Sequence, residues 1–146
     1  MAFEIERKFL VNDTSYRAMA CSHKEISQGY LNRDPERTVR VRIADNAGFI
    51  TVKGRSSGAT RVEFEYEVPC DDARQMLALC QGKVLVKTRW IVNYNDFTWE
   101  VDEFHGDREG LVVAEIELPD ERISFPLPAF VGREVTGDPA FYNSML

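Results

Sequence analysis

Apolar and polar residues alternate with a period of two along most of the chain, which is the pattern of half-buried β-strands. Residues 3–11 show it first: Phe3, Ile5 and Phe9 fall on one side of the predicted strand, and charged residues occupy much of the other. Similar extended runs follow, so that the expected strands are residues 3–11, 25–32, 38–44, 49–53, 59–68, 84–94, 97–104 and 111–118.

Two helices are expected between these strands. The polar stretch 12–15 can cap a short helix over residues 16–21. A longer helix starts at Cys70, because the next two residues are acidic and suit the positive end of a helix dipole, and Gly82 should stop it. The tail beyond Leu118 contains four prolines, so it is expected to form only loops and short helical turns.

The chain shows no internal repeat and no break in composition, so residues 1–146 are expected to form a single domain. Eight strands in so small a domain favour a sheet that closes on itself, because closure removes exposed strand edges. The predicted fold class is therefore α+β, mainly antiparallel β: a closed eight-stranded barrel with a few flanking helices.

Residues two apart in a strand point to the same side of the sheet. By this rule, full charges are concentrated on one face of nearly every predicted strand. A sheet with one solvent face also alternates, but such a face would draw on Ser, Thr, Asn and Gln as well. Here acids and bases lie largely on separate strands. The residues concerned are Glu4, Glu6, Lys8, Arg40, Arg42, Lys53, Arg61, Glu63, Glu65, Glu67, Lys87, Arg89, Glu100, Asp102, Glu115 and Glu117.

A barrel that closed with these charges inside could not be empty and dry, because uncompensated buried charge is very costly. It becomes reasonable if the interior holds water, a polyanion and a divalent metal. Arg and Lys bind phosphate oxygens, and Glu and Asp bind hard cations such as Mg²⁺ or Mn²⁺. Together they could stabilise a phosphoryl group in transfer, which predicts phosphohydrolase chemistry.

The order of these charges also carries a family resemblance. The chain opens with Glu-x-Glu-x-Lys at Glu4, Glu6 and Lys8. Further matching positions are Gln28-Gly29-Tyr30-Leu31, Arg40-x-Arg42, Lys53, Arg61-x-Glu63-x-Glu65, Lys87-x-Arg89, Asp102, Glu115-x-Glu117, the tail Gly132–Gly137 and Tyr142-Asn143. In this order and over nearly the whole chain, the pattern resembles the CYTH superfamily, the triphosphate tunnel metalloenzymes of short bacterial type.

The resemblance implies an eight-stranded tunnel that binds a triphosphate along its axis with two metal ions, Mg²⁺ or Mn²⁺. Glu63, Glu65 and Glu67 share one face, so either neighbouring pair could be the metal-binding one, and Arg61 favours the first pair. The implied phosphate-binding residues are Lys8, Arg40, Arg42, Lys53, Arg61, Lys87 and Arg89. The implied metal ligands are Glu4, Glu6, Glu63, Glu65, Asp102, Glu115 and Glu117.

The resemblance also implies a catalytic Lys–Tyr pair, whose places are taken here by Lys8 and Tyr30. A lysine in a site crowded with cations could have a lowered pKa and take a proton from the attacking water. The alternative is that Lys8 only binds phosphate, and the sequence leaves both roles open.

Hydrolysis of inorganic triphosphate to pyrophosphate and phosphate is the leading functional hypothesis, because the short chain has no extra element for a base or a thiazole. The alternatives are a class IV-type adenylate cyclase and a thiamine or nucleoside triphosphatase. A polyphosphate-binding module without activity is the third possibility, but a pure anion binder gains nothing from many inward carboxylates.

Bulk properties limit the partners and the location. The net charge of −6 argues against broad binding to nucleic acid or to an anionic membrane. The first residues contain no signal-peptide core and no later run could span a bilayer. The three cysteines fit no metal or redox spacing, which favours reduced thiols and a cytoplasmic protein. An exposed apolar flank of the barrel could support a homodimer.

Overall fold

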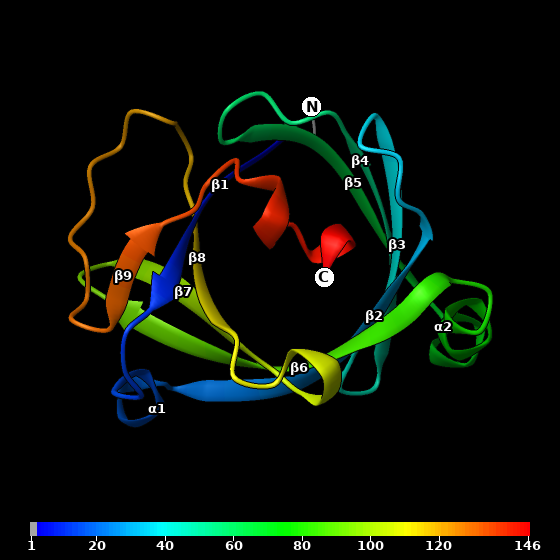
Figure 1. The fold of residues 1–146 in the computed structure, drawn as a ribbon, viewed down its shortest axis with the longest axis horizontal. Helices are drawn as coiled ribbons and strands as arrows, with labels where there is room; N and C mark the ends of the chain where they lie inside the picture. The colour runs from blue at the N-terminus through cyan, green and yellow to red at the C-terminus, as the bar shows by residue number, and fades with distance from the viewer. Residues whose placement is uncertain (1–2) are drawn as a thin grey trace.

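The computed structural model describes residues 3–146, and its strands form one antiparallel sheet that closes on itself (Figure 1). The strand order is β5-β4-β3-β2-β6-β7-β8-β1-β9, and a pairing of β5 with β1 closes the barrel. The predicted eight-stranded antiparallel barrel is therefore confirmed, with one additional strand. The strands are β1 (Phe3–Val11), β2 (Ser22–Asn32), β3 (Arg37–Ala44), β4 (Ala47–Gly54), β5 (Thr60–Val68), β6 (Gln81–Tyr94), β7 (Phe97–Phe104), β8 (Val112–Glu117) and β9 (Val131–Glu134).

The first strand is the seam of the barrel. Residues 6–10 of β1 pair with β8, whereas the pairing with β5 covers only residues 3–5, with Glu4 opposite Arg61. Further along, Phe9 and Val11 pair with β9. The period of two within β1 thus places its charged face toward the interior and its apolar face outside.

The ninth strand corrects the prediction for the tail. Prolines 126 and 128 do exclude regular structure just before it, but Val131–Glu134 then adds to β1. Four residues are too few to show a clear alternation. The strand exists because β1 offers it an edge, which is a property of the assembled sheet.

The helices are shorter than the sequence predicts. The α1 helix covers only Tyr16–Met19, because the chain is already extended at Ala20, and α2 covers Cys70–Leu77. Gly82, expected to stop α2, instead lies in β6 with a φ of 68°. Short 3₁₀ turns complete the fold: η1 (Gly106–Arg108), η2 (Pro139–Phe141) and η3 (Asn143–Met145). No helix among the described residues is both long and apolar enough to cross a membrane.

The main hydrophobic core lies on the outside of the barrel wall. The outward side chains of β1, β6, β7 and β8 pack under α1 and the loop 119–130. There, the ring centroids of Phe9 and Trp99 are 5.6 Å apart and those of Tyr16 and Phe130 are 5.9 Å apart. This arrangement leaves the interior free for polar groups. The buried members are Phe9, Tyr16, Val92, Trp99, Val101, Ala114, Ile116, Leu118, Phe130 and Val131.

The α2 helix covers another part of the wall, over β3 and β4. Gly48 allows its close approach, because a Cβ at this position would lie 2.8 Å from the Cβ of Ala73. The outer face formed by β1, β4 and β5 is less covered, and Phe3, Phe64 and Tyr66 are exposed there.

The interior is apolar at one end only. On β1, Lys8 is followed on the same face by Leu10, and on β6, Lys87 is preceded by Leu85. These residues meet in a small second core made of Leu85, Phe104 and Val113, with Leu10, Leu111 and Leu146 packed against it. The chain after β9, red in Figure 1, turns back into the ring of strands near this end.

Candidate functional site

A cavity of about 350 Å³ lies inside the barrel, and charged side chains dominate its lining. Nearly all of the predicted site residues meet there, although they come from seven different strands. The predicted residues in the lining are Glu4, Glu6, Lys8, Tyr30, Arg40, Arg42, Lys53, Arg61, Glu63, Glu65, Lys87, Arg89, Glu115 and Glu117. Asp102 is the exception and lies behind the lining.

The charges are separated into two halves of the barrel. The strands β4, β3, β2 and β6 are neighbours in the sheet and carry the basic arc: Lys24, Arg40, Arg42, Lys53, Lys87 and Arg89. The other four, β7, β8, β1 and β5, carry the acidic arc: Glu4, Glu6, Glu63, Glu65, Glu100, Glu115 and Glu117. Lys8 and Arg61 are the two cations within the acidic arc.

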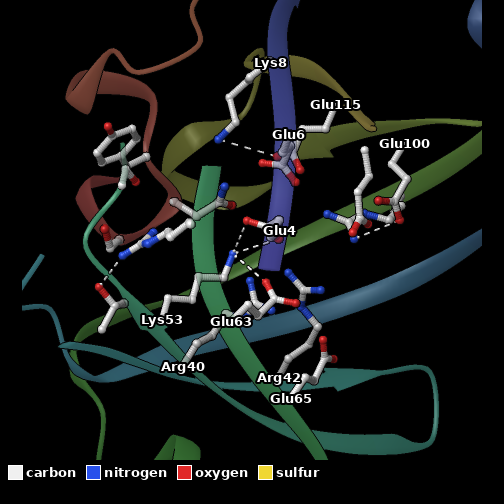
Figure 2. A pocket seen from close by; sticks show the side chains of 18 of the residues that line it. Glu4, Glu6, Lys8, Arg40, Arg42, Lys53, Glu63, Glu65, Glu100 and Glu115 are labelled. Carbon is white, nitrogen blue, oxygen red and sulfur yellow. Dashed lines mark hydrogen bonds and ion pairs between the residues drawn. The ribbon is translucent and has the colours of Figure 1, made fainter. Parts of the chain in front are cut away.

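Lys53 joins the two arcs (Figure 2). Its Nζ lies 3.1 Å from Glu4 Oε1 and 3.2 Å from Glu63 Oε2. Burial and the hydrogen bond that protonated Glu63 donates to Glu4 raise the pKa of Glu63 to about 7. Burial acts against ionisation of Glu4 too, but Lys53 outweighs it and lowers the pKa of Glu4. The two carboxyl groups therefore share one proton and one ammonium near neutral pH.

Glu6 and Glu115 form a second close carboxyl pair. Burial raises the pKa of Glu6 well above its usual value, and the charges of Glu115 and Glu4 add to this. Burial also disfavours the Glu115 carboxylate, but Lys8 and Arg89 outweigh that effect and hold its pKa well below normal. Two pairs of crowded carboxyl oxygens thus face the cavity.

Of the two roles left open for Lys8, the one that needs a lowered pKa does not agree with its surroundings. Burial alone would lower it, but the negative charges of Glu115, Glu6 and Asp102 raise it above the usual value. The sequence suggested a site crowded with cations, whereas this lysine lies on the acidic arc, with its Nζ 3.5 Å from Glu115 and 3.0 Å from the carbonyl oxygen of Phe141. Tyr30, its predicted partner, is buried in the same lining.

The basic arc is held by a carboxylate beneath it. Asp102 is completely buried and its Oδ2 lies 2.7 Å from Lys87 Nζ. Arg89 binds the same carboxylate with two nitrogens, at 2.8 and 2.9 Å. The neighbouring cations lower the Asp102 pKa although burial opposes this. Both oxygens are thus occupied by protein cations, which fits a positioning role, while the predicted role as a metal ligand stays a prediction.

Two further arginines complete the basic arc. Arg40 is 8% exposed, donates to Thr51 Oγ1 at 3.2 Å, and leaves its Nε without a partner. Burial and the charges of Arg40 and Arg89 lower the pKa of Arg42 to about 9. A buried, unpartnered donor and mutual repulsion between guanidinium groups both indicate that this wall is complete only with an anion against it.

The carboxyl groups fit a hard divalent cation by their chemistry, because Mg²⁺ and Mn²⁺ prefer oxygen ligands. The pairs Glu4–Glu63 and Glu6–Glu115 would hold it, and a cation would relieve the crowding that raises the pKa values of Glu6 and Glu63. Within residues 3–146, however, no three His, Cys, Asp or Glu side chains already converge on one point. At the Glu4–Glu63 pair, binding would also require Lys53 to give up its contacts with both carboxyl groups.

Several lining residues were not predicted as site residues. Glu100 was already placed on the charged face of its strand, and Lys24 has the same parity as Tyr30, so the period of two points to both. Asn143 comes from the proline-containing tail, where no periodicity exists to place it. Glu65 lines the cavity and Glu67 does not appear among its described lining residues, which agrees with the register that Arg61 favoured.

Comparisons with known proteins agree with this geometry. The model of the CYTH domain family matches residues 2–142. An inorganic triphosphatase of Acetivibrio thermocellus is 48% identical over 147 aligned residues, covering 100% of this chain and 94% of that protein. A crystal structure of another inorganic triphosphatase has a TM-score of 0.67 and 28% identity, covering 97% of this chain and 95% of its own. Protein PH1012 of Pyrococcus horikoshii has a TM-score of 0.65 at 24% identity, covering 81% and 79% of the two chains, which shows the fold alone.

Proposed function

Because the chain belongs to the CYTH domain family, we propose that it hydrolyses inorganic triphosphate to pyrophosphate and phosphate in the barrel cavity. The resemblance read from the sequence motifs is thereby confirmed. The observation that carries the proposal is the pair of arcs, basic and acidic, that face one another across about 350 Å³. The similarity to inorganic triphosphatases over the whole chain supports the same substrate.

The basic arc would bind the phosphate oxygens. Arg89 and Lys87 are fixed from behind by Asp102, so they meet the anion without further reorganisation. Arg40 would supply its unpartnered Nε. As the bridging P–O bond breaks, negative charge grows on the departing pyrophosphate oxygen, and fixed cations stabilise that charge more than they stabilise the ground state.

The acidic arc would hold one or two Mg²⁺ or Mn²⁺ ions through Glu4, Glu6, Glu63, Glu65, Glu115 and Glu117. When bound, such an ion supplies charge neutralisation at phosphate oxygens and lowers the pKa of an attacking water. Lys8, with its raised pKa, stays protonated and binds phosphate in this proposal. Tyr30 and Arg61 would complete the lining around the substrate.

The test is phosphate release from tripolyphosphate with Mg²⁺ or Mn²⁺, alongside ATP, thiamine triphosphate and long-chain polyphosphate. Glu4→Ala and Lys8→Ala should each reduce turnover far more than threefold, since each loses a contact to metal or phosphate. Arg7→Ala is the matched control, because Arg7 lies between them on the outer face and pairs with Glu134. Equal rates in all three variants would contradict the site assignment. Cyclic AMP formed from ATP would favour a cyclase, and tight binding without turnover a binding module.

The proposal includes a cytoplasmic single-domain protein that forms a homodimer. Free thiols at Cys21, Cys70 and Cys80 support the compartment. The exposed Phe64 and Tyr66 on the outer face of β5 support self-association, because contiguous exposed apolar surface marks interaction sites. Sedimentation at several concentrations, with Tyr66→Glu as the disrupting variant, tests it; a wild type that stays monomeric would refute the dimer.

A further inference from the structure

The segment 139–145 enters the barrel and contacts both arcs with acceptor oxygens. The carbonyl of Phe141 accepts from Lys8 Nζ at 3.0 Å. Asn143 Oδ1 accepts twice, from Lys87 Nζ at 3.2 Å and from Gln28 Nε2 at 3.1 Å. Lys87 and Gln28 are both 0% exposed. One amide oxygen from the tail therefore satisfies two of the most deeply buried donors around the cavity.

Gln28 extends this contact to a second cation, because its Oε1 accepts from Arg42 Nε at 2.9 Å. The orientation of both amides is fixed by the groups at the two ends, since Arg and Lys side chains only donate. Gln28 must turn its oxygen to Arg42 and its nitrogen to Asn143. Asn143 must then present its oxygen, which is also what Lys87 requires. The four side chains form one hydrogen-bonded row with a single consistent polarity.

The number of donors on Lys87 indicates what this row does. An ammonium group has three N–H donors. Asp102 takes one at 2.7 Å and Asn143 takes a second at 3.2 Å. One donor then remains, and with two contacts fixed its direction is fixed as well. Without Asn143 the ammonium would be free to rotate about its contact with Asp102.

We propose that Asn143 is a positioning residue that directs Lys87 and, through Gln28, Arg42 toward the triphosphate. The inference rests on the proposed function, because only a triphosphate bound in the cavity gives the direction of these cations a role. It makes Phe141 and Asn143 part of the active site, although neither side chain carries a charge. Phe141 contributes in the same way by fixing Lys8 through its carbonyl oxygen.

The first test compares Asn143→Leu, which keeps the shape and removes the acceptor, with Met145→Ala, an exposed position in the same segment. Asn143→Leu should reduce kcat for tripolyphosphate roughly 10- to 100-fold, because two buried donors lose their partner. Met145→Ala should change kcat less than about threefold. If folded Asn143→Leu keeps kcat and KM within threefold of wild type, the proposal is overturned.

Rescue separates positioning from simple stability. Asn143→Asp keeps an accepting oxygen, so it should recover most of the kcat lost in Asn143→Leu while raising KM through repulsion of the triphosphate. Combining Gln28→Leu with Asn143→Leu should cost less than the product of the two single losses, because both act in one row. Should Asn143→Leu fail to fold, Gln28→Leu and Asn143→Asp decide the question. An unchanged kcat in Gln28→Leu overturns the proposal. A kcat loss in Asn143→Asp as large as that in Asn143→Ala overturns it as well.

A measurement without turnover keeps the inference distinct from the proposed function. Burial lowers the pKa of Lys87 to about 7, so the measurement is made at a pH below this value. There, NMR of ¹⁵N-labelled lysine in the folded wild type should show a Lys87 ammonium signal protected from exchange, and Asn143→Leu should lose it. A protected signal that persists in the variant overturns the inference even if the enzyme is active. Absence of phosphate release by the wild type would instead refute the proposed function. The ammonium signal would then still test whether Asn143 holds Lys87 in the hydrogen-bonded row.

Discussion

The basic and acidic arcs of the cavity are built on similar strands but are completed in opposite ways. On the basic arc, Asp102 and two neutral amides hold the cations in place, and Arg89 has both a fixed orientation and a balanced charge. On the acidic arc, Glu6 and Glu63 have raised pKa values because they are buried and because carboxyl groups lie against one another. The protein itself therefore organises the anion-binding wall, whereas the opposite wall is left with a deficit of positive charge.

The difference matches what each wall would bind. A phosphate chain gains most from donors whose direction is set before it arrives. A divalent cation needs several oxygens that can close around it, and crowded carboxyl groups supply these at little cost once the cation neutralises them. Substitutions on the two arcs should consequently affect stability and activity in different proportions.

The largest expected effect is a loss of stability when Asp102, the carboxylate that holds the cations of the basic arc, is removed. Asp102→Ala should lower the free energy of unfolding by about 3–5 kcal/mol, because it removes the buried carboxylate that pairs with both Lys87 and Arg89 and leaves Arg89 only the partly exposed Glu100 as an anionic partner. Urea unfolding followed by circular dichroism measures this. Asp107→Ala is the control, since the ion pair of Asp107 with Lys83 is mostly exposed and its loss should leave the stability nearly unchanged. Equal losses in the two variants would mean that the basic arc does not depend on Asp102.

The acidic arc should show the reverse proportion. Glu6→Gln should reduce metal-dependent turnover roughly 100-fold, because an oxygen ligand of the cation is lost. In metal-free buffer the same variant should be as stable as the wild type or more so, since the repulsion with Glu115 and Glu4 is relieved. Kinetics and urea unfolding of one preparation compare the two quantities. A metal-free variant destabilised as strongly as Asp102→Ala would show that the arcs are not different in kind.

Metal addition should stabilise the protein through the acidic arc alone. A cation that binds only the folded state adds about 2.7 kcal/mol at a concentration of 100 times its Kd. Thermal unfolding with Mg²⁺ or Mn²⁺, reversed by EDTA, should show this shift for the wild type and for Arg40→Gln. In Glu6→Gln the shift should be much smaller. A shift of the same size in both variants would place the cation elsewhere.

The smallest effect concerns a carboxylate on the outer wall. Its contribution to stability can be compared with the contributions of the charges inside the cavity. Glu103 accepts from Tyr16 and Arg17, and these contacts lower its pKa although burial opposes the shift. Its contribution is thus fully present above its unfolded pKa of about 4.3 and disappears as the pH falls through the lower folded value. Glu103→Gln should cost about 1 kcal/mol at pH 7. The difference from wild type should shrink below about pH 4; a difference independent of pH would contradict the assignment.

Most of the barrel could be predicted because strand faces are a local property. The alternation of Glu4, Glu6 and Lys8 with Phe3 and Ile5 needs no tertiary information, and the same is true of β7, whose bounds match the prediction. The start of α2 at Cys70 was predicted, but its C-terminal end and the existence of β9 were missed, because these depend on contacts with distant strands.

The candidate site shows the same division. Its charged members could be identified, since charge on a strand face of an otherwise apolar sheet is visible in the sequence. The sign of the Lys8 pKa shift could not, because Glu115 becomes its neighbour only when β1 pairs with β8. The role of Asn143 could not be predicted either, although the residue belongs to the family pattern, because that role depends on two donors from distant strands.

The sequence by itself determined the chemistry of this protein: which side chains are charged, which strand faces carry them, and the family to which they point. Only the tertiary structure decided how those charges are divided into two walls, which carboxylate supports cations and which groups lie crowded together. The physical reason is that the preference for a strand is set by near neighbours in the chain. Electrostatic energy depends on distances in space, and closure of the barrel sets those distances.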